Sequence, residues 1–253
     1  MLSLVKHQPP KIDAHIVGDM KKITVLICDD HTVVRQGLRS LLETAEDMKV
    51  IGEAENGQIA VAEASRLQPD VILMDLAMPS LNGVEAARRI SGKLPSTRVL
   101  ILSTYSDEKH LRQAIDAGAA GYLTKETAWT DLLRAIREAT RGNRFFTPEI
   151  IRRSLDALPA LPWRASRAAC PLTSRQTEIV QLIAEGYSTN EIAEKIAISP
   201  KTVEKHRQSV MNKLDIHEIA TLTRFALTEG IIAIDEPLPR QVALRVSTIH
   251  SGH

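Results

Sequence analysis

Residues 21–143 alternate between short, continuously apolar runs and amphipathic stretches. The five runs are rich in Val, Ile and Leu and mostly lack polar alternation; they are Ile23–Cys28, Val50–Ala54, Val71–Met74, Val99–Leu102 and Gly121–Thr124. Strands that are buried on both faces of a parallel sheet have this pattern. Apolar residues at helical spacing follow each run and predict helices at Val33–Leu42, Gln58–Leu67, Val84–Ile90, Glu108–Ala117 and Thr130–Arg141. Five strand-helix units predict a doubly wound α/β domain with a five-stranded parallel sheet.

From Thr173 onward the hydrophobic period is helical, and no strand pattern remains. Two capping boxes and one Ser-Pro pair mark the starts of three helices; they are Thr173 with Gln176, Ser188 with Glu191, and Ser199 with Pro200. The third helix extends to about Leu214, and a fourth covers about 218–228. This part of the chain therefore predicts a small all-α domain of four helices that contains a helix-turn-helix.

The distribution of charge and proline separates these two units. The whole chain has a formal net charge of +1, whereas residues 144–169 alone have a net charge of +3 and include several prolines. A basic, proline-rich stretch between two nearly neutral units is typical of a connector. We therefore expect a flexible tail over 1–20, an α/β domain over 21–143, a linker over 144–169, a helical domain over 170–235 and a second flexible tail over 236–253.

The composition, 43% hydrophobic and 25% charged, is that of an ordinary globular protein. No apolar run approaches the roughly 18 residues that cross a bilayer, and Met1–Pro10 lacks the apolar segment of a secretory signal. The two cysteines, Cys28 and Cys170, make no disulfide framework. We expect a cytoplasmic protein with reduced thiols and no membrane partner.

Chemically specific residues follow the ends of the predicted strands. They are Asp29 and Asp30 after the first strand, Asp75 after the third, Ser103 after the fourth and Lys125 after the fifth. In such sheets ligands bind at the carboxyl ends of the strands. Converging carboxylates repel one another unless a cation lies among them, and a hard ion such as Mg²⁺ suits oxygen ligands. With an ammonium and a hydroxyl added, the set predicts a phosphoryl site in which Asp75 is the covalent acceptor.

The same residues stand within motifs that resemble a known family. Ile27-Cys28-Asp29-Asp30-His31, Met74-Asp75-Leu76-Ala77-Met78-Pro79 with Gly83, Leu102-Ser103-Thr104, and Gly121-Tyr122-Leu123-Thr124-Lys125 are similar to the receiver domain of two-component response regulators. The resemblance implies a flavodoxin-like fold and a cognate sensor histidine kinase that phosphorylates an aspartate, which is Asp75 here.

The resemblance also assigns a role to the neighbouring residues. It implies Mg²⁺ ligands at Asp29, Asp30, Asp75 and the backbone carbonyl of Ala77, a phosphate-pairing lysine at Lys125, and a switch pair at Ser103 and Tyr122. Many receivers have a proline joined through a cis bond after that lysine, whereas this chain has Glu126. A cis bond there would cost about 2.5–4 kcal/mol without proline, so that geometry is not carried over to this chain.

The third helix of the second domain has two distinct faces. At 100° per residue Val203, Val210 and Leu214 form an apolar stripe, and the opposite face holds Lys201, Lys205, Gln208 and Asn212. The segment 195–213 has a net charge of +4. A local cationic stripe on a nearly neutral domain is typical of contact with the phosphate backbone of double-stranded DNA.

Motifs in this domain resemble the LuxR-type DNA-binding domain. They are Leu172-Thr173-Ser174-Arg175-Gln176-Thr177-Glu178, Ala184-Glu185-Gly186-Tyr187-Ser188-Thr189-Asn190-Glu191-Ile192-Ala193 and Lys201-Thr202-Val203-Glu204-Lys205-His206. A receiver followed by this domain is typical of the NarL/FixJ class. The resemblance places the third helix in the major groove and a dimer contact on the fourth. It implies DNA contacts from Lys201, Thr202, Lys205, His206, Gln208 and Lys213, although His206 could equally pack against the core.

These observations predict a transcriptional regulator rather than an enzyme. Phosphorylation of Asp75 with Mg²⁺ would control promoter binding by a homodimer, either because the receiver masks the third helix or because it supplies the dimer interface. One alternative is an orphan regulator that works without phosphorylation. The other is a Mg²⁺-dependent aspartyl-phosphate phosphohydrolase, although such enzymes usually have a second carboxylate where this chain has Ala77.

Overall fold

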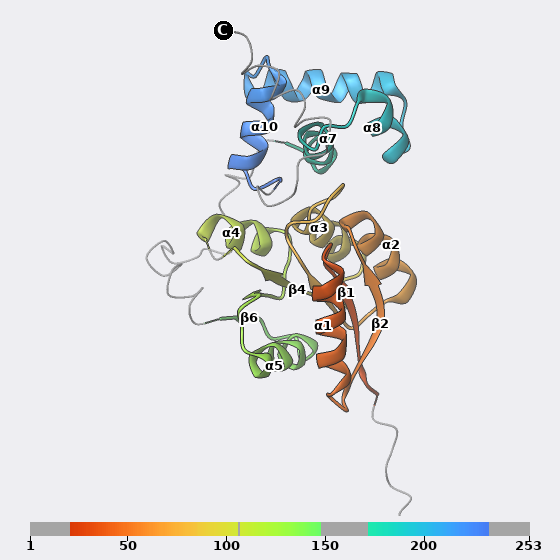
Figure 1. Cartoon of the computed structure of the whole chain (residues 1–253), viewed down its shortest axis with the longest axis vertical. Helices are drawn as coiled ribbons and strands as arrows, with labels where there is room; N and C mark the ends of the chain where they lie inside the picture. Colours follow the sequence, from red (N-terminus) through yellow and green to blue (C-terminus); the bar gives the residue numbers. More distant parts are fainter. Residues whose placement is uncertain (1–20, 106, 148–171, 233–253) are drawn as a thin grey trace, which may run out of the picture.

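The computed structural model describes residues 21–105, 107–147 and 172–232. Both expected tails, the linker beyond Thr147 and Cys170 lie outside the described residues. The described residues form an α/β domain and a helical domain, which lie one above the other in Figure 1. Helix α7 (Ser174–Ala184) of the helical domain faces the α/β domain in that view.

The α/β domain is built on one parallel sheet. Its strands are β1 (Ile23–Cys28), β2 (Met48–Ala54), β3 (Val71–Met74), β4 (Arg98–Ser103), β5 (Gly121–Thr124) and β6 (Phe145–Phe146), in the order β2-β1-β3-β4-β5-β6. The prediction of a parallel α/β sheet is confirmed, but the expected count of five strands is wrong. Strand β6 pairs with β5 and contains only two residues, which is too short for a hydrophobic run to reveal.

Five helices cover the two faces of this sheet. They are α1 (Thr32–Glu43), α2 (Gly57–Leu67), α3 (Gly83–Lys93), α4 (Glu108–Asp116) and α5 (Trp129–Thr140). Alternate residues of each strand enter two different cores because successive side chains point to opposite faces. Leu26 and Ile72 lie in the core beneath α2, α3 and α4, whereas Val25 and Leu73 lie in the core beneath α1 and α5. Both faces are therefore buried, as the uninterrupted apolar runs predict.

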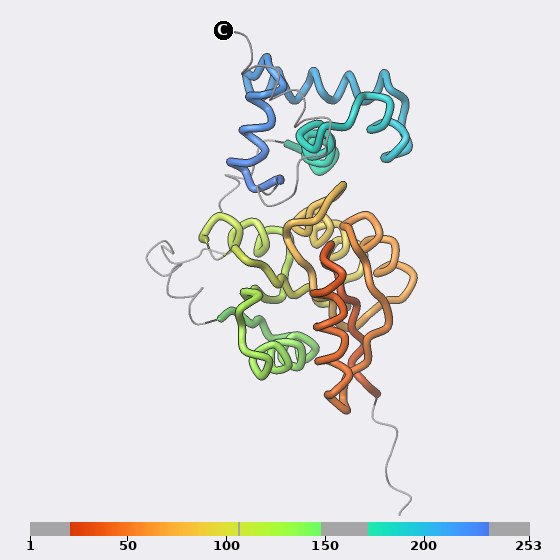
Figure 2. Tube along the Cα trace, viewed as in Figure 1, coloured from red at the N-terminus to blue at the C-terminus, as the bar shows by residue number. Residues whose placement is uncertain are grey.

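The helical domain contains α7, α8 (Thr189–Lys195), α9 (Pro200–Leu214) and α10 (Ile219–Thr228). Both predicted capping boxes are present, and the Ser199 side chain accepts a hydrogen bond from the Thr202 backbone N–H. Val203 and Val210 are 1% and 0% exposed, so the predicted apolar stripe of α9 faces the core. The tube in Figure 2 shows α9 running along the side of this domain that is remote from the sheet.

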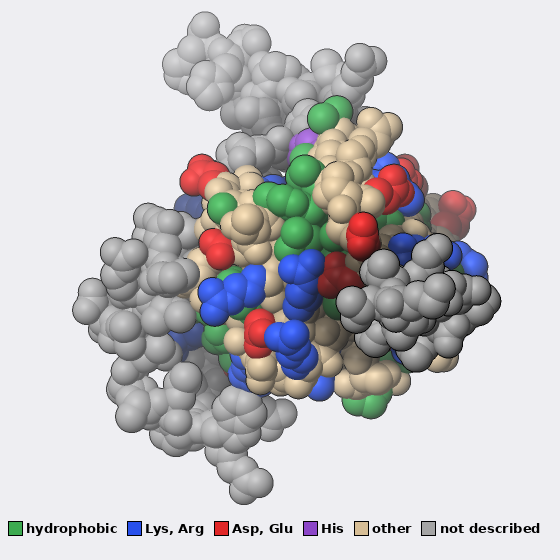
Figure 3. All heavy atoms as spheres, turned by 90° about the horizontal axis from the view of Figure 1, so that it is seen from below, with side chains coloured by type: hydrophobic (Ala, Val, Ile, Leu, Met, Phe, Trp, Pro, Cys, Tyr) green, Lys and Arg blue, Asp and Glu red, His purple; other side chains and the backbone are tan. Residues whose placement is uncertain are grey.

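The end of the α/β domain furthest from the helical domain has a mixed surface. Figure 3 views this end and shows Lys and Arg side chains interspersed with Asp and Glu. Within the described part of the chain, no helix combines the length and the apolar character needed to cross a bilayer.

Candidate functional site

Three of the predicted site residues meet at the carboxyl edge of the sheet. Asp29 follows β1, Asp75 follows β3 and Lys125 follows β5. The two carboxylates are almost completely buried, with 1% and 4% of their surfaces exposed. The Lys125 ammonium Nζ lies 2.7 Å from Asp29 Oδ2 and 2.9 Å from Asp75 Oδ2. The fold therefore brings these three residues together at one edge of the sheet, with the Lys125 ammonium between the two buried acids.

Burial and charge act in opposite directions in this group. Burial raises the pKa of Asp75 to about 6, the Lys125 ammonium opposes that rise, and the Asp29 charge adds to it. Burial would lower the pKa of Lys125, but the charges and hydrogen bonds of Asp75 and Asp29 outweigh it and raise that pKa. Lys125 is thus a fixed counterion for the acids.

The acidic group has the composition of a divalent cation site. One ligand atom from each of Asp29, Asp30, His31 and Asp75 lies within 4.8 Å of the others. Asp30 Oδ1 is buried without a hydrogen-bond donor, although His31 Nδ1 lies 2.8 Å from it. Carboxylate oxygens gathered this closely fit a hard cation, because such ions take oxygen ligands. The residues present therefore fit Mg²⁺, the ion that the sequence predicts.

The loop after Asp75 is held close to the acid. The Leu76 backbone N–H donates to Asp75 Oδ1 at 2.8 Å. A Cβ at position 83 would lie 1.8 Å from the Asp75 carbonyl oxygen. Because residue 83 is glycine, the start of α3 can pack directly against the backbone of Asp75. Ala77 lies in this loop and is half-buried, with Leu76 and Met78 beside it in the lining of a cavity.

Ser103 and Tyr122 are both fully buried beside this edge. Ser103 Oγ accepts a hydrogen bond from the Tyr105 backbone N–H at 3.1 Å, and the Tyr122 hydroxyl donates to the Tyr105 carbonyl at 2.9 Å. Burial raises the pKa of the Tyr122 phenol. The Tyr105 ring stacks on His110 with 4.6 Å between the ring centroids. Tyr105, which the sequence reading did not single out, therefore joins both predicted switch residues to α4.

Arg35 is a second residue that sequence reasoning missed. Its Nη1 donates to the carbonyls of Asp29 at 2.7 Å and Asp30 at 3.2 Å, and its Nε contacts Glu53 Oε2 at 3.2 Å. The guanidinium therefore fixes the turn that carries the acid pair. A single arginine on the polar face of a predicted helix carries no signal that distinguishes this role from solvation.

Lys125 reaches the acids without an unusual backbone. The described residues contain no cis peptide bond, so the Lys125–Glu126 bond is trans. The Lys125 backbone N–H donates to the Ser103 carbonyl at 2.9 Å, which extends the pairing of β4 with β5 up to the site.

The predicted DNA-contacting residues lie along α9. Lys201, Lys205 and Gln208 are exposed, whereas Thr202 and His206 are partly buried. The Thr202 hydroxyl lies 2.8 Å from Ser199 Oγ at the cap of the helix. Lys213 is exposed too, but its ammonium donates to Gln176 Oε1 on α7 at 2.9 Å. The exposed group therefore forms a polar stripe opposite the buried valines.

Two protein families match this chain. The response regulator receiver domain matches residues 25–137, and the luxR family of bacterial regulatory proteins matches residues 170–226. Neither match indicates an enzyme family. Receiver domains in general bind Mg²⁺ at an acidic pocket, and Asp29, Asp30 and Asp75 form such a pocket here.

Several bacterial regulators match this chain over most of its length, across both domains. The transcriptional regulatory protein YdfI of Bacillus subtilis is 38% identical over 211 residues, which are 83% of this chain and 98% of that protein. The response regulator protein VraR of Staphylococcus aureus is 37% identical over 210 residues, 83% of this chain and 99% of that protein. A solved structure of the RcsB response regulator from Salmonella typhimurium has a TM-score of 0.51 and 29% identity, and covers 81% of this chain and 98% of its own. The chain therefore belongs to the response regulators that join a receiver domain to a LuxR-type helix-turn-helix domain.

Proposed function

We propose that this protein is a phosphorylation-controlled transcriptional regulator whose phosphoacceptor is Asp75. The proposal rests on the group formed by Asp29, Asp75 and Lys125. In this group the buried Asp75 carboxylate lies beside a second acid and a cation. A sensor histidine kinase donates the phosphoryl group. The N–P bond of its phosphohistidine breaks as an O–P bond forms at an Asp75 oxygen.

Mg²⁺ would be held by Asp29, Asp30, Asp75 and the Ala77 carbonyl. When bound, it neutralises charge on the transferred phosphoryl group. Side chains and backbone groups of the chain would hold the phosphoryl oxygens. Lys125 is close enough to pair with a phosphoryl oxygen, and the Leu76 N–H already donates to the carboxylate that accepts the group. The Ser103 hydroxyl is the further donor that the new oxygens can recruit.

The helical domain would read promoter DNA through α9 in the major groove. Lys201, Lys205 and Gln208 are exposed there, and we assign base or phosphate contacts to these residues and to Thr202, His206 and Lys213. Structures of RcsB bound to DNA are among the similar solved structures. A homodimer of the phosphorylated or DNA-bound protein would bind two half-sites about one helical turn apart, in the cytoplasm.

The domain limits follow the same proposal. The receiver covers 21–143, and β6 (Phe145–Phe146) extends its sheet into the first residues of the expected linker 144–169; the DNA-binding domain covers 170–235. Each alternative function lacks a supporting observation. An orphan regulator would not need Asp29, Asp75, Ser103 and Lys125 together. A phosphohydrolase would need a second acid where the chain has Ala77.

The test combines DNA selection with phosphorylation. Selection from random-sequence duplexes should enrich a site with approximate two-fold symmetry. The affinity for that site should change when the wild type is treated with Mg²⁺ and acetyl phosphate, and it should not change for Asp75→Asn. An equal response of both proteins to the phosphodonor would refute control through Asp75.

A further inference from the structure

The polar face of α9 is accessible in this structure. Figures 1 and 2 show α9 on the side of the helical domain that is remote from the receiver. Within the described part of the chain, the hydrogen bonds between this domain and the receiver come from α7 and from residues at and after the end of α10. Masking of α9 by the receiver, one of the two couplings that the sequence left open, is therefore not the arrangement here.

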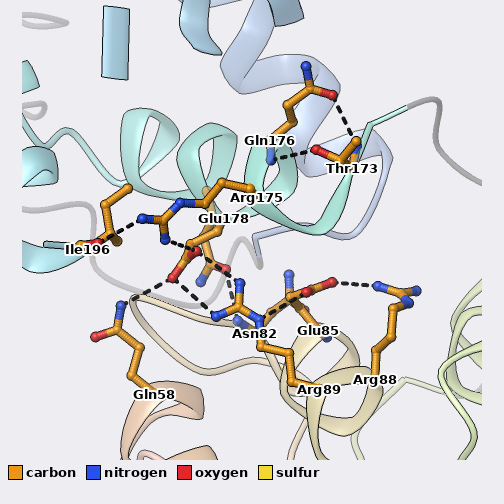
Figure 4. A network of polar contacts seen from close by, with 11 residues as sticks. Gln58, Asn82, Glu85, Arg88, Arg89, Thr173, Arg175, Gln176, Glu178 and Ile196 are labelled. Carbon is orange, nitrogen blue, oxygen red and sulfur yellow. Dashed lines mark hydrogen bonds and ion pairs between the residues drawn. The ribbon is translucent and has the colours of Figure 1, made fainter. Parts of the chain in front are cut away.

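The last two turns of α9 are fixed by one side chain of α7. Gln176 Nε2 donates to Ser209 Oγ at 3.1 Å, and Gln176 Oε1 accepts from Lys213 Nζ at 2.9 Å. Gln176 is itself only 5% exposed, and its amide closes the capping box with Thr173, as Figure 4 shows. Side chains on these turns of α9 therefore project from a backbone of fixed position, which is what a precise binding surface requires.

Two exposed amides lie one turn apart on this part of α9. Gln208 and Asn212 are four residues apart, on the face opposite the buried Val203 and Val210. Gln208 Nε2 donates a hydrogen bond to Asn212 Oδ1 at 2.9 Å. A side-chain amide has two N–H donors and one carbonyl oxygen. The bond to Asn212 therefore leaves the Gln208 amide with one N–H donor and with Oε1 as an acceptor.

One donor and one acceptor on the same amide match adenine. In the major groove adenine presents its N7 acceptor beside the N6 amino donor, whereas guanine presents two acceptors, N7 and O6. The remaining N–H of Gln208 can donate to adenine N7 while Oε1 accepts from the N6 amino group. Guanine would need two N–H donors from the same side chain, and Asn212 already occupies one of them. The hydrogen bond to Asn212 therefore favours adenine over guanine.

The exposed lysines of the same stripe have a different chemistry. Lys201 and Lys205 end in ammonium groups, which have donors and no acceptor, so they cannot pair with the amino donor of adenine. Such groups suit phosphate oxygens, which are the same for every sequence. The pyrimidines offer Gln208 a single hydrogen bond each, to the O4 of thymine or from the N4 of cytosine. Adenine is thus the base with which the Gln208 amide can form two bonds.

We infer that Gln208 recognises an adenine in each half-site, and that Asn212 is the positioning residue that sets this choice by holding one N–H of the Gln208 amide. The inference rests on the proposed function, because it requires α9 to lie in the major groove. It adds the base that is read and the reason for the discrimination. A matched pair of hydrogen bonds of this kind changes the preference between two bases by about 10-fold.

The test is selection of binding sites from random-sequence duplexes by the full chain, with and without Mg²⁺ and acetyl phosphate. Sequencing of the bound duplexes gives the base preference at every position of the half-site. The variants are Gln208→Ala, Gln208→Glu, Asn212→Ala and Asn212→Asp, with Lys205→Ala as the comparison. Gln208 and Asn212 are exposed, so the melting temperatures of their variants should stay close to that of the wild type. Changes in base preference then report on recognition and not on folding.

The variants of Gln208 test which base is read. The wild type should prefer adenine to guanine by about 10-fold at one position of each half-site, and Gln208→Ala should lose this preference. Gln208→Glu should prefer cytosine there, because a carboxylate accepts from the N4 amino group of cytosine and cannot donate to adenine N7. Lys205→Ala should bind all duplexes more weakly and keep the preference for adenine at that position.

The variants of Asn212 test the positioning role. Asn212→Ala returns the second N–H to the Gln208 amide, so the preference for adenine over guanine should fall to about 2-fold. Asn212→Asp keeps an oxygen that accepts from Gln208 Nε2, so it should retain the preference, although its negative charge should lower the affinity for every duplex. A merely structural role of Asn212 would not change the ratio of adenine to guanine.

Three results separate the possible failures. Unchanged base preferences in Gln208→Ala, or a Gln208-dependent preference for a base other than adenine, would overturn the inference while leaving DNA binding intact. Equal ratios of adenine to guanine in Asn212→Ala and the wild type would overturn the positioning role of Asn212. A wild type that enriches no sequence, with or without the phosphodonor, would instead overturn the proposed function.

Discussion

Lys125 extends its ammonium to within 2.9 Å of the Asp75 carboxylate, across the carboxyl edge of the sheet. The same ammonium contacts Asp29, so one cation compensates two acids that are almost completely buried. Mg²⁺ and Lys125 would therefore neutralise the same carboxylates. Removal of Lys125 should then change how strongly Mg²⁺ stabilises the protein.

Lys125→Ala should make stability strongly dependent on Mg²⁺. Without the ammonium, two buried carboxylates lose their counterion, and the free energy of unfolding should fall by about 2 kcal/mol in the absence of a divalent ion. Added Mg²⁺ should bind more tightly than in the wild type and restore most of the loss. Thermal unfolding with and without MgCl₂ measures both effects.

Lys49→Ala is the control, because Lys49 is exposed on β2 near the opposite end of the sheet. Its melting temperature should shift with Mg²⁺ as that of the wild type does. If Mg²⁺ raises the melting temperature of Lys125→Ala no more than that of the wild type, Lys125 and the ion do not share these carboxylates.

Arg35→Ala should weaken Mg²⁺ binding, because Arg35 anchors the backbone of the turn that carries Asp29 and Asp30. Groups that orient metal ligands typically change metal affinity 10- to 100-fold, and we expect about 10-fold here. Titration calorimetry with MgCl₂ gives the affinity. Arg39→Ala is the matched variant, since Arg39 pairs with the same Glu53 through its Nε at 2.6 Å. Equal losses of Mg²⁺ affinity in both variants would show that the ion pairs with Glu53, and not the contacts of Arg35 with the turn, determine that affinity.

Lys205→Ala should reduce the salt dependence of DNA binding. Lys205 is exposed on α9, and each phosphate contact contributes about 0.9 to the slope of log affinity against log salt concentration. The slope is measured on random-sequence duplex DNA, for which no operator need be known, and should fall by about that amount. Lys93→Ala, which removes an exposed charge at the end of α3, should leave it unchanged. An unaltered slope in Lys205→Ala would exclude the residue from the interface.

The sequence predicts well what depends on local patterns. Runs such as Val71–Met74 identify buried strands, and Ser199 with Pro200 places the start of α9, because short-range physics decides both. The acid and lysine positions at strand ends follow from topology, since parallel strands bring their carboxyl ends to one edge. These features allow the fold and the core of the site to be read before any coordinates.

Long-range contacts leave no such pattern. Strand β6 has only two residues, too few for a recognisable pattern. In the sequence, Arg35 looks like any arginine on the polar face of a helix, and only the folded structure shows that it contacts the Asp29 carbonyl. Gln181 and Glu185 read as the polar face of a capped helix, yet they are buried against the receiver loop. Their partners lie about a hundred positions earlier in the chain, at a distance where no periodicity applies.

Asp75 should accept a phosphoryl group in a Mg²⁺-dependent reaction. This is measured by tandem mass spectrometry of the full chain after incubation with Mg²⁺ and acetyl phosphate. One phosphoryl group should map to Asp75; it should be absent after EDTA treatment and in Asp75→Asn, and present in the surface control Asp116→Asn. A phosphoryl group on another residue, or one that forms equally well without a divalent ion, would show that Asp75 is not a Mg²⁺-dependent phosphoacceptor.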